Sequence, residues 1–164
     1  MPFNTIFMRA FIAFALLFAA NPSFSQDKEC ALEAIRTLRL GAGFQILSQQ
    51  VAKSTTTYLV LQNKLGQLKA DELMNMELAA SVQKYQDQWD RNLAQAWGAL
   101  MTCEELTSLA SLKQQSPYSR KFMSLNNQAA AAMQNQSQPL LNTAVSEALT
   151  RAFTQSQSGT ALNN

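Results

Sequence analysis

The stretch that decides the fold is Thr102–Phe122, with the sequence TCEELTSLASLKQQSPYSRKF. Thr102 and Glu105 have the spacing of a capping box, in which the threonine hydroxyl accepts a backbone N–H and the glutamate carboxylate accepts the N–H of the cap residue. Ser116 and Pro117 are of the types preferred at a helix N-cap and at the first helical position. The stretch therefore predicts a short capped helix, a turn and a second helix start.

A long helix is predicted on the amino-terminal side of this stretch. Asp71 is a residue type that caps helices. Apolar side chains then recur at alternating steps of three and four, the pattern of one buried helix face: Leu78, Val82, Tyr85, Trp89, Leu93, Ala96 and Leu100. An unbroken helix of this kind is about 45 Å long, at about 1.5 Å per residue.

Two shorter amphipathic patterns precede the long helix. The first covers residues 27–40 and ends at Gly41-Ala42-Gly43, where glycine favours a helix stop. The second runs over residues 44–68, with a bend expected at Ser54–Thr57, because hydroxyl side chains compete for backbone hydrogen bonds. These hydroxyl side chains are expected to form a solvated helix face, and the alternative is the polar rim of a ligand site.

A further helix is predicted to follow the turn. From Pro117 one apolar face continues to Phe153, and Pro139 is expected to kink the helix because it removes a backbone hydrogen bond. Residues 154–164 are polar and uncharged, and we expect a disordered tail. Few Gly, few Pro and rare β-branched runs agree with an all-α chain.

The first 25 residues have the pattern of an export signal. Arg9 precedes an apolar run over residues 10–20, and Asn21-Pro22 follows it. Ser23 and Ser25 are small residues at the positions that signal peptidase requires before Gln26. The run is short for a membrane span, so we expect a cleaved signal peptide over residues 1–25, with an uncleaved anchor as the alternative. We expect a periplasmic protein with no stable membrane insertion after cleavage, and a helical domain over residues 26–153.

The composition argues against several classes of function. The chain has no histidine, which removes the commonest general base and most zinc sites. Its formal net charge is +2 and the charges are spread along the chain, so no basic face for nucleic acid is predicted. Neither a catalytic set, nor a metal site, nor a cofactor is predicted, and we expect a protein that is not an enzyme.

The two cysteines, Cys30 and Cys103, are expected to form a disulfide. An even number of cysteines in an exported chain favours a bridge, because the compartment is oxidising. The alternative, a reactive thiol or redox pair, lacks a CxxC spacing and a histidine. The bridge would join the first helix to the short helix of the central stretch.

A Ser-x-x-Lys pattern occurs at Ser81 and Lys84 and matches acyl-transfer enzymes, but the companion motifs of those enzymes are absent. A chance occurrence of serine and lysine three residues apart on a bundle helix explains this pattern better. The adjacent carboxylates of Asp71-Glu72 and of Glu104-Glu105 are explained by helix capping, because negative charge is favoured at a helix start.

Five residues are candidates for an interaction site or pocket: Trp89, Trp97, Tyr118, Arg120 and Phe122. Trp89 and Trp97 are two turns apart and can face the same way. They form either aromatic core or, with Phe122, the wall of an apolar cavity. Arg120 can bind an anionic partner, and a solvated cation is the alternative.

The same region resembles a family of bacterial exported proteins, domain-of-unknown-function family 2059. The resemblance lies between Trp89 and Phe122: an aromatic-bearing helix, then Glu104-Glu105-Leu106 opening a short helix, then Ser116-Pro117 and a basic-apolar restart. It implies an all-helical periplasmic domain and no particular activity.

These observations lead to one structural and one functional prediction. The structural prediction is a single-domain, all-α bundle of five or six helices, with one long central helix and a Pro-kinked carboxyl-terminal helix. The functional prediction is a non-enzymatic periplasmic protein that binds a periplasmic or envelope protein. The alternatives are a carrier of a small apolar ligand and an inhibitor or immunity protein against a periplasmic toxin.

Overall fold

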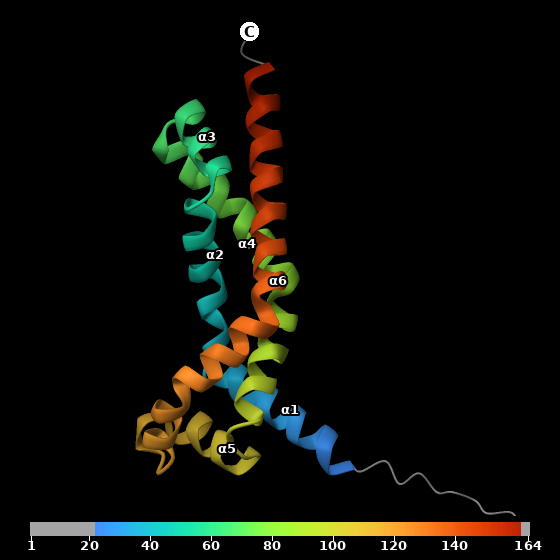
Figure 1. Ribbon diagram of the computed structural model, residues 1–164, viewed down its shortest axis with the longest axis vertical. Coiled ribbons are helices and arrows are strands. Elements are labelled where there is room, and N and C mark those ends of the chain that lie inside the picture. The colour runs from blue at the N-terminus through green and yellow to red at the C-terminus, as the bar shows by residue number, and fades with distance from the viewer. Residues whose placement is uncertain (1–21, 162–164) are drawn as a thin grey trace, which may run out of the picture.

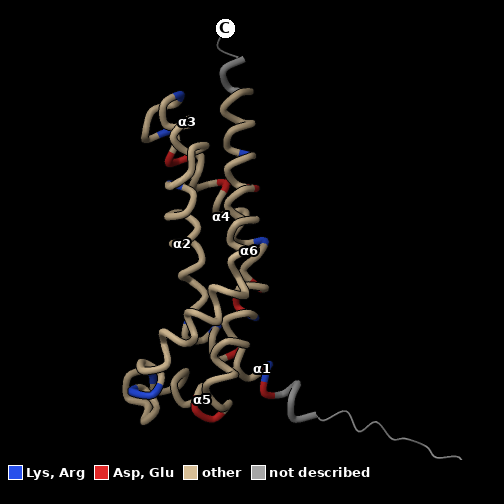
Figure 2. The backbone as a smooth tube through the Cα atoms, in the orientation of Figure 1, with Lys and Arg blue, Asp and Glu red and all other residues tan. Residues whose placement is uncertain are grey.

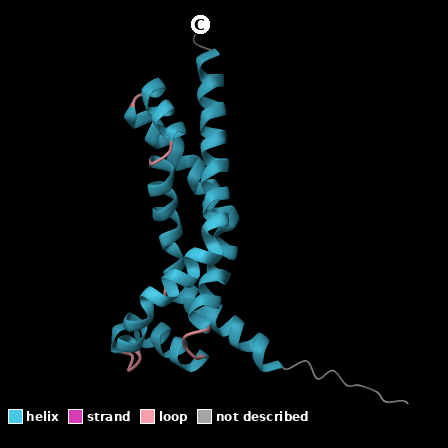
Figure 3. Ribbon diagram, viewed as in Figure 1, coloured by secondary structure: helices cyan, strands magenta, loops and turns pink. Residues whose placement is uncertain are grey.

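The computed structural model describes residues 22–161, which form six α-helices and two short 3-10 helices (Figures 1 and 3). Most of the predicted signal peptide therefore lies outside the described residues. No strand occurs in this part of the chain. The prediction of an all-α bundle is confirmed.

The junction of the first two helices lies against Gln86 and Asp90 of the long central helix. Helix α1 covers Pro22–Thr37, a 3-10 turn covers Leu40–Ala42, and α2 covers Gly43–Lys53. The predicted glycine stop is wrong in its residue, because the left-handed conformation is adopted by Arg39 (φ 55°). Gly41 is instead buried against α4, where a Cβ atom would overlap the carboxylate of Asp90.

The predicted bend at Ser54–Thr57 is a full break between α2 and α3 (Thr56–Leu65). Thr55 caps α3, since its Oγ1 accepts the N–H of Tyr58 at 3.2 Å. Thr55 Oγ1 also donates to the carbonyl of Ala52 at 2.7 Å, which ends α2. Competition between hydroxyl and backbone groups at Thr55 therefore divides the predicted helix in two.

Helix α4 covers Gln67–Gly98 and is the long central helix. The prediction that Asp71 caps it is wrong, because the helix starts one turn earlier, after Gly66 at φ 77°. Asp71 lies inside α4, where its carboxylate accepts from Tyr58 Oη at 2.8 Å and pairs with Lys53 Nζ at 2.8 Å. It thereby joins α2, α3 and α4.

The central stretch folds into the predicted short helix, turn and second helix, but the predicted first helical position, Pro117, is wrong, because α6 begins at Ser119. Helix α5 covers Cys103–Leu112 and has a capping box between Thr102 and Glu105. A 3-10 turn at Lys113–Gln115 follows, and Ser116 Oγ accepts the N–H of Tyr118 at 3.3 Å before α6 begins. The Cys30–Cys103 disulfide is formed, with a Cα–Cα distance of 5.8 Å, and it joins α1 to α5.

Helix α6 covers Ser119–Ala161 and contains Pro139. Figure 1 shows its ribbon changing direction in the orange part, in the region of this proline. The helix continues beyond Phe153, so the predicted disordered tail is wrong as far as Ala161. Ser156 is buried, and Lys64 Nζ of α3 donates to its carbonyl at 2.9 Å. This contact between α3 and α6 fixes the carboxyl-terminal segment. The polar sequence of that segment does not predict that it packs.

Two clusters of buried side chains fill the molecule. The larger, which we call the stem core, is formed by α2, α3, α4 and α6: Phe44, Ala52, Tyr58, Leu61, Ala70, Met74, Leu78, Val82, Trp89, Met133, Leu141, Ala144, Val145, Ala148, Leu149 and Ala152. The smaller, the base core, is formed by α1, α4, α5 and α6: Ala31, Leu32, Ala34, Ile35, Ala94, Trp97, Met101, Leu106, Leu109 and Ala129. Figure 1 shows α1 and α5, which contribute to the base core, at the lower end of the molecule, and α2 and α3, which contribute to the stem core, beside the upright part of α6.

Candidate functional site

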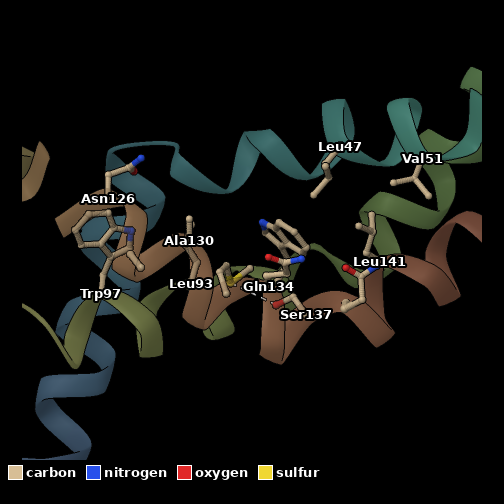
Figure 4. A pocket seen from close by; sticks show the side chains of 13 residues that line it. Leu47, Val51, Leu93, Trp97, Asn126, Ala130, Gln134, Ser137 and Leu141 are labelled. Carbon is tan, nitrogen blue, oxygen red and sulfur yellow. Dashed lines mark hydrogen bonds between the residues drawn. The ribbon is translucent and has the colours of Figure 1, made fainter. Parts of the chain in front are cut away.

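A groove of about 460 Å³ lies between α2, α4 and α6, and we call it the main groove. Figure 4 shows Leu47 and Val51 extending from α2 toward α6, which contributes Gln134, Ser137 and Leu141. The volume is within the range of small-molecule and peptide pockets, about 300–1,000 Å³. The main groove is larger than a second hollow of about 410 Å³ on α6, which Thr143 and Glu147 line.

The floor of the main groove is one face of α4. Trp89, Leu93 and Trp97 line it at intervals of four residues, which places them along one side of the helix. Trp89 is stacked on Phe44, with ring centroids 4.4 Å apart, and Trp97 is stacked on Phe122, with centroids 4.1 Å apart. Each indole is held by a ring behind it, so the floor is preformed.

One rim of the main groove is polar but uncharged. Asn126, Gln134 and Gln138 of α6 line it and are exposed, with Ala130 between them. No charged residue occurs between Lys121 and Glu147, and Figure 2 shows this stretch of α6 in tan. The deeper Ser137 is buried, and Asn92 Nδ2 donates to its hydroxyl at 2.9 Å.

A second hollow of about 300 Å³, the distal groove, continues the main groove along α6. The two hollows share Val51, and Asn142 of the distal groove follows Leu141 of the main groove. Thr55 and Thr57 line the distal groove from the α2–α3 junction. Thr55 and Thr57 therefore line a hollow, and a ligand site at the Ser54–Thr57 run stays a prediction.

Charged side chains near the stem core bind one another. Arg151 Nε donates to Glu77 Oε2, and Arg151 Nη2 donates to Ser81 Oγ at 2.7 Å. Lys84 Nζ donates to both carboxylate oxygens of Glu147, at 3.0 and 2.9 Å. None of these residues lines the main groove in the described part of the chain, so its surface carries no charge.

The Ser-x-x-Lys pattern does not form a catalytic pair. Ser81 is buried and bound by Arg151, whereas Lys84 is bound by Glu147. Tyr85 and Glu147 beside the Lys84 ammonium hold its pKa above the ordinary value, which is the opposite of what a general base requires. The hydroxyl and the amine therefore serve different structural contacts.

The five candidate residues have different positions. Trp89 and Trp97 line the main groove, and Phe122 lies behind Trp97 rather than in the lining. Tyr118 is half-buried and packs against the base core, and Arg120 is exposed. The structure thus brings the two tryptophans together and leaves Tyr118 and Arg120 outside the groove.

The sequence interpretation missed the two walls of the groove. Leu47 and Val51 fall within the helical pattern of residues 44–68, which does not indicate that they line a groove, and the α6 amides lie on the polar side of their helix. A signal for the α6 wall is present in the sequence, since Asn126, Gln134 and Gln138 lie on one four-residue repeat within an uncharged segment.

The described residues form neither a metal site nor a membrane span. No group of three acidic, cysteine or histidine side chains within residues 22–161 is arranged to hold a metal ion. In the same part of the chain, no helix combines the length and the apolar character needed to cross a membrane.

No family model matches this chain, and neither does any curated protein or solved structure. The resemblance to the exported helical family therefore stays a prediction.

Proposed function

We propose that this protein is an exported, non-enzymatic binding protein of the periplasm that receives a hydrophobic segment of a partner protein in the main groove. The observation that supports the proposal is the groove itself, which has two tryptophans in its floor, aliphatic side chains on α2 and no charge. Tryptophan is enriched among the residues that dominate binding energy, because it buries a large rigid surface.

The groove is suited to binding because little ordering is required. Trp89 and Trp97 are already held by ring stacking, and Phe44 behind Trp89 is fully buried. Side chains that are fixed before binding lose less conformational freedom when the partner arrives. Trp89 is 8% exposed and Trp97 is 3% exposed, so both indoles also belong to the buried cores.

Export is part of the proposal and is supported by two features. Residues 1–25 have the order of a signal peptide, and the Cys30–Cys103 disulfide agrees with an oxidising compartment. Amino-terminal sequencing of the protein from a periplasmic extract should give a chain that begins at Gln26. A chain that keeps Met1 and sediments with membranes would contradict this part.

Binding can be tested by co-purification from the native periplasm. Ala130→Arg places a long cation in the main groove, and Gln128→Arg places the same cation on an exposed position of α6 that does not line it. We expect one envelope protein to co-purify with the wild type and with Gln128→Arg, and at least tenfold less of it with Ala130→Arg. Equal recovery with both variants would contradict the role of the groove.

A carrier of a small apolar ligand is the second candidate, favoured by the volume of about 460 Å³. Native mass spectrometry of the extracted protein distinguishes the two. A retained lipid that is lost in Ala130→Arg would support the carrier and contradict the protein partner.

A further inference from the structure

The disulfide between Cys30 and Cys103 lies close to the end of α4 that carries Trp97. Ala31, the residue after Cys30, is buried against Gly98, since a Cβ atom placed on that glycine would lie 3.5 Å from the Cβ atom of Ala31. Gly98 follows Trp97 in the sequence and is the last residue of α4. Cys30 is therefore one residue away from the contact between α1 and this end of α4.

The other cysteine reaches Trp97 through α5 and α6. Cys103 is the first residue of α5, and Glu105 in the same turn pairs with Lys121 Nζ of α6 at 2.6 Å. The residue after Lys121 is Phe122, whose ring is stacked on Trp97 with centroids 4.1 Å apart. Contacts that begin beside the two cysteines thus reach Trp97 from α1 and from α6.

Helix α1 depends on the disulfide at its amino-terminal end. Residues 27–29 are exposed, whereas Leu32 and Ile35 are buried in the base core together with Trp97. In the mature chain that the export signal predicts, α1 is the terminal helix, and chain ends separate easily unless they are tied down. The bond from Cys30 to α5 ties this end and keeps α1 on the base core.

An external thiol can reach the disulfide. Both cysteines are half-buried, and Thr107 beside them is exposed. The Thr107 hydroxyl lies 3.5 Å from Cys30 Sγ and 3.9 Å from Cys103 Sγ. A hydroxyl donor beside sulfur stabilises the thiolate that leaves when a disulfide is attacked.

We propose that the Cys30–Cys103 disulfide is a redox switch for the Trp97 end of the main groove. In the oxidised protein, α1 and α5 are joined and Trp97 is buried. In the reduced protein, the amino-terminal part of α1 separates and Trp97 becomes accessible to solvent, because local opening begins where a chain end is released. Control of the groove rests on the proposed function, since it assumes that a partner binds there.

An external dithiol drives the switch in one direction and an external disulfide in the other. In reduction, a thiolate of the dithiol attacks one sulfur and the other cysteine leaves as a thiolate. The second thiol of the dithiol then breaks the mixed disulfide, so the protein gains two electrons and two protons and the dithiol becomes a disulfide. In oxidation, a disulfide of another protein accepts the same two electrons and two protons.

Acrylamide quenching of fluorescence tests the switch, because the chain has two tryptophans and each core contains one. Trp89→Phe leaves Trp97 to report on the base core, and Trp97→Phe leaves Trp89 to report on the stem core. On reduction with dithiothreitol, the quenching constant of Trp97 should rise about threefold, and that of Trp89 should stay within about a fifth of its value. In the double variant Cys30→Ser with Cys103→Ser, dithiothreitol should change neither.

Two outcomes overturn the switch. An unchanged quenching constant of Trp97 would show that α1 stays in place without the disulfide. An equal increase for both tryptophans would show that the disulfide stabilises the whole molecule and does not control one end of it.

Co-purification connects the switch to the main groove. The oxidised wild type should recover the envelope protein, and Cys30→Ser with Cys103→Ser should recover at least tenfold less. Equal recovery by both proteins would overturn the control of the groove. Recovery by neither would contradict the proposed function, while the quenching result still decides whether the switch exists, so the two failures are distinguishable.

Discussion

The base core and the stem core are held together by different means. At the base, a disulfide joins α1 to α5, and a capping box fixes the start of α5. In the stem no described residue forms a covalent link between helices, and the buried Glu77 is instead bound by Arg151 and by Gln155 Nε2 at 2.6 Å. The smaller core has the disulfide, and the larger one relies on packing and on an ion pair in which only Glu77 is buried.

The comparison teaches how the groove is supported. Trp97 lies in the base core and Trp89 in the stem core, so the floor of the groove crosses the boundary between them. Loss of the disulfide should therefore loosen the Trp97 end of the main groove first. Loss of the ion pair should loosen the part of α6 that follows Pro139, which borders the distal groove.

The largest expected effect on stability comes from removing the Cys30–Cys103 disulfide. In the oxidised protein the bridge closes a loop with a sequence separation of 73. The double variant Cys30→Ser with Cys103→Ser should lower the free energy of unfolding by about 4 kcal/mol, because the unfolded chain regains freedom. Denaturant unfolding followed by tryptophan fluorescence measures it, and the reduced wild type should behave like the variant. A loss below about 1 kcal/mol would show that the base core is stable without the bridge.

The next effect concerns the stem. Arg151→Met leaves the Glu77 carboxylate buried without its cation, and we expect a loss of about 2 to 3 kcal/mol, since Arg151 is itself partly exposed. Hydrogen exchange should increase first in residues 145–158. The double variant Glu77→Gln with Arg151→Met should recover part of the stability, because the unpaired charge is gone. If the double variant loses as much free energy of unfolding as the two single variants together, direct coupling between Glu77 and Arg151 is ruled out.

A smaller effect is expected at the start of α5. Thr102→Ala removes the acceptor for the N–H of Glu105, which is bound at 3.3 Å. The loss should be about 1 kcal/mol, typical for a helix N-cap, and Thr102→Ser should retain most of the stability. Because Cys103 is the next residue, the loss should be smaller when the disulfide is intact than when it is reduced. Equal losses in both states would show that cap and bridge act independently.

The smallest effect is a change in pH dependence. The hydrogen bonds from Lys53 and then Tyr58 hold the pKa of the Asp71 carboxyl below its ordinary value. The folded state therefore binds this proton less tightly than the unfolded state does. The contribution of Asp71 is present above the unfolded pKa and is lost as pH falls through the folded pKa. Asp71→Asn should flatten the fall in stability between about pH 5 and pH 2, measured by thermal unfolding across that range. An unchanged slope would assign the acid sensitivity to other carboxylates.

Local rules in the sequence determined several parts of the fold. The capping box at Thr102 and Glu105 is confirmed because both partners lie within one turn of the same helix. The common face of Trp89 and Trp97 follows from helical periodicity. The Cys30–Cys103 pairing is confirmed because only one pairing of two cysteines exists within the chain. In each case the prediction depends only on the spacing of residues along the chain or on the number of cysteines.

Other features depended on which helices became neighbours. Asp71 has the sequence character of a cap, yet it is an interior residue of α4 that binds Lys53 and Tyr58 from two other helices. The segment after Phe153 is polar, yet the contact from Lys64 holds it in α6. The groove lies where α2, α4 and α6 meet, so three helices that are far apart in the sequence line it. Periodicity shows which side of a helix is buried, but only tertiary packing decides which neighbour covers that side and where none does.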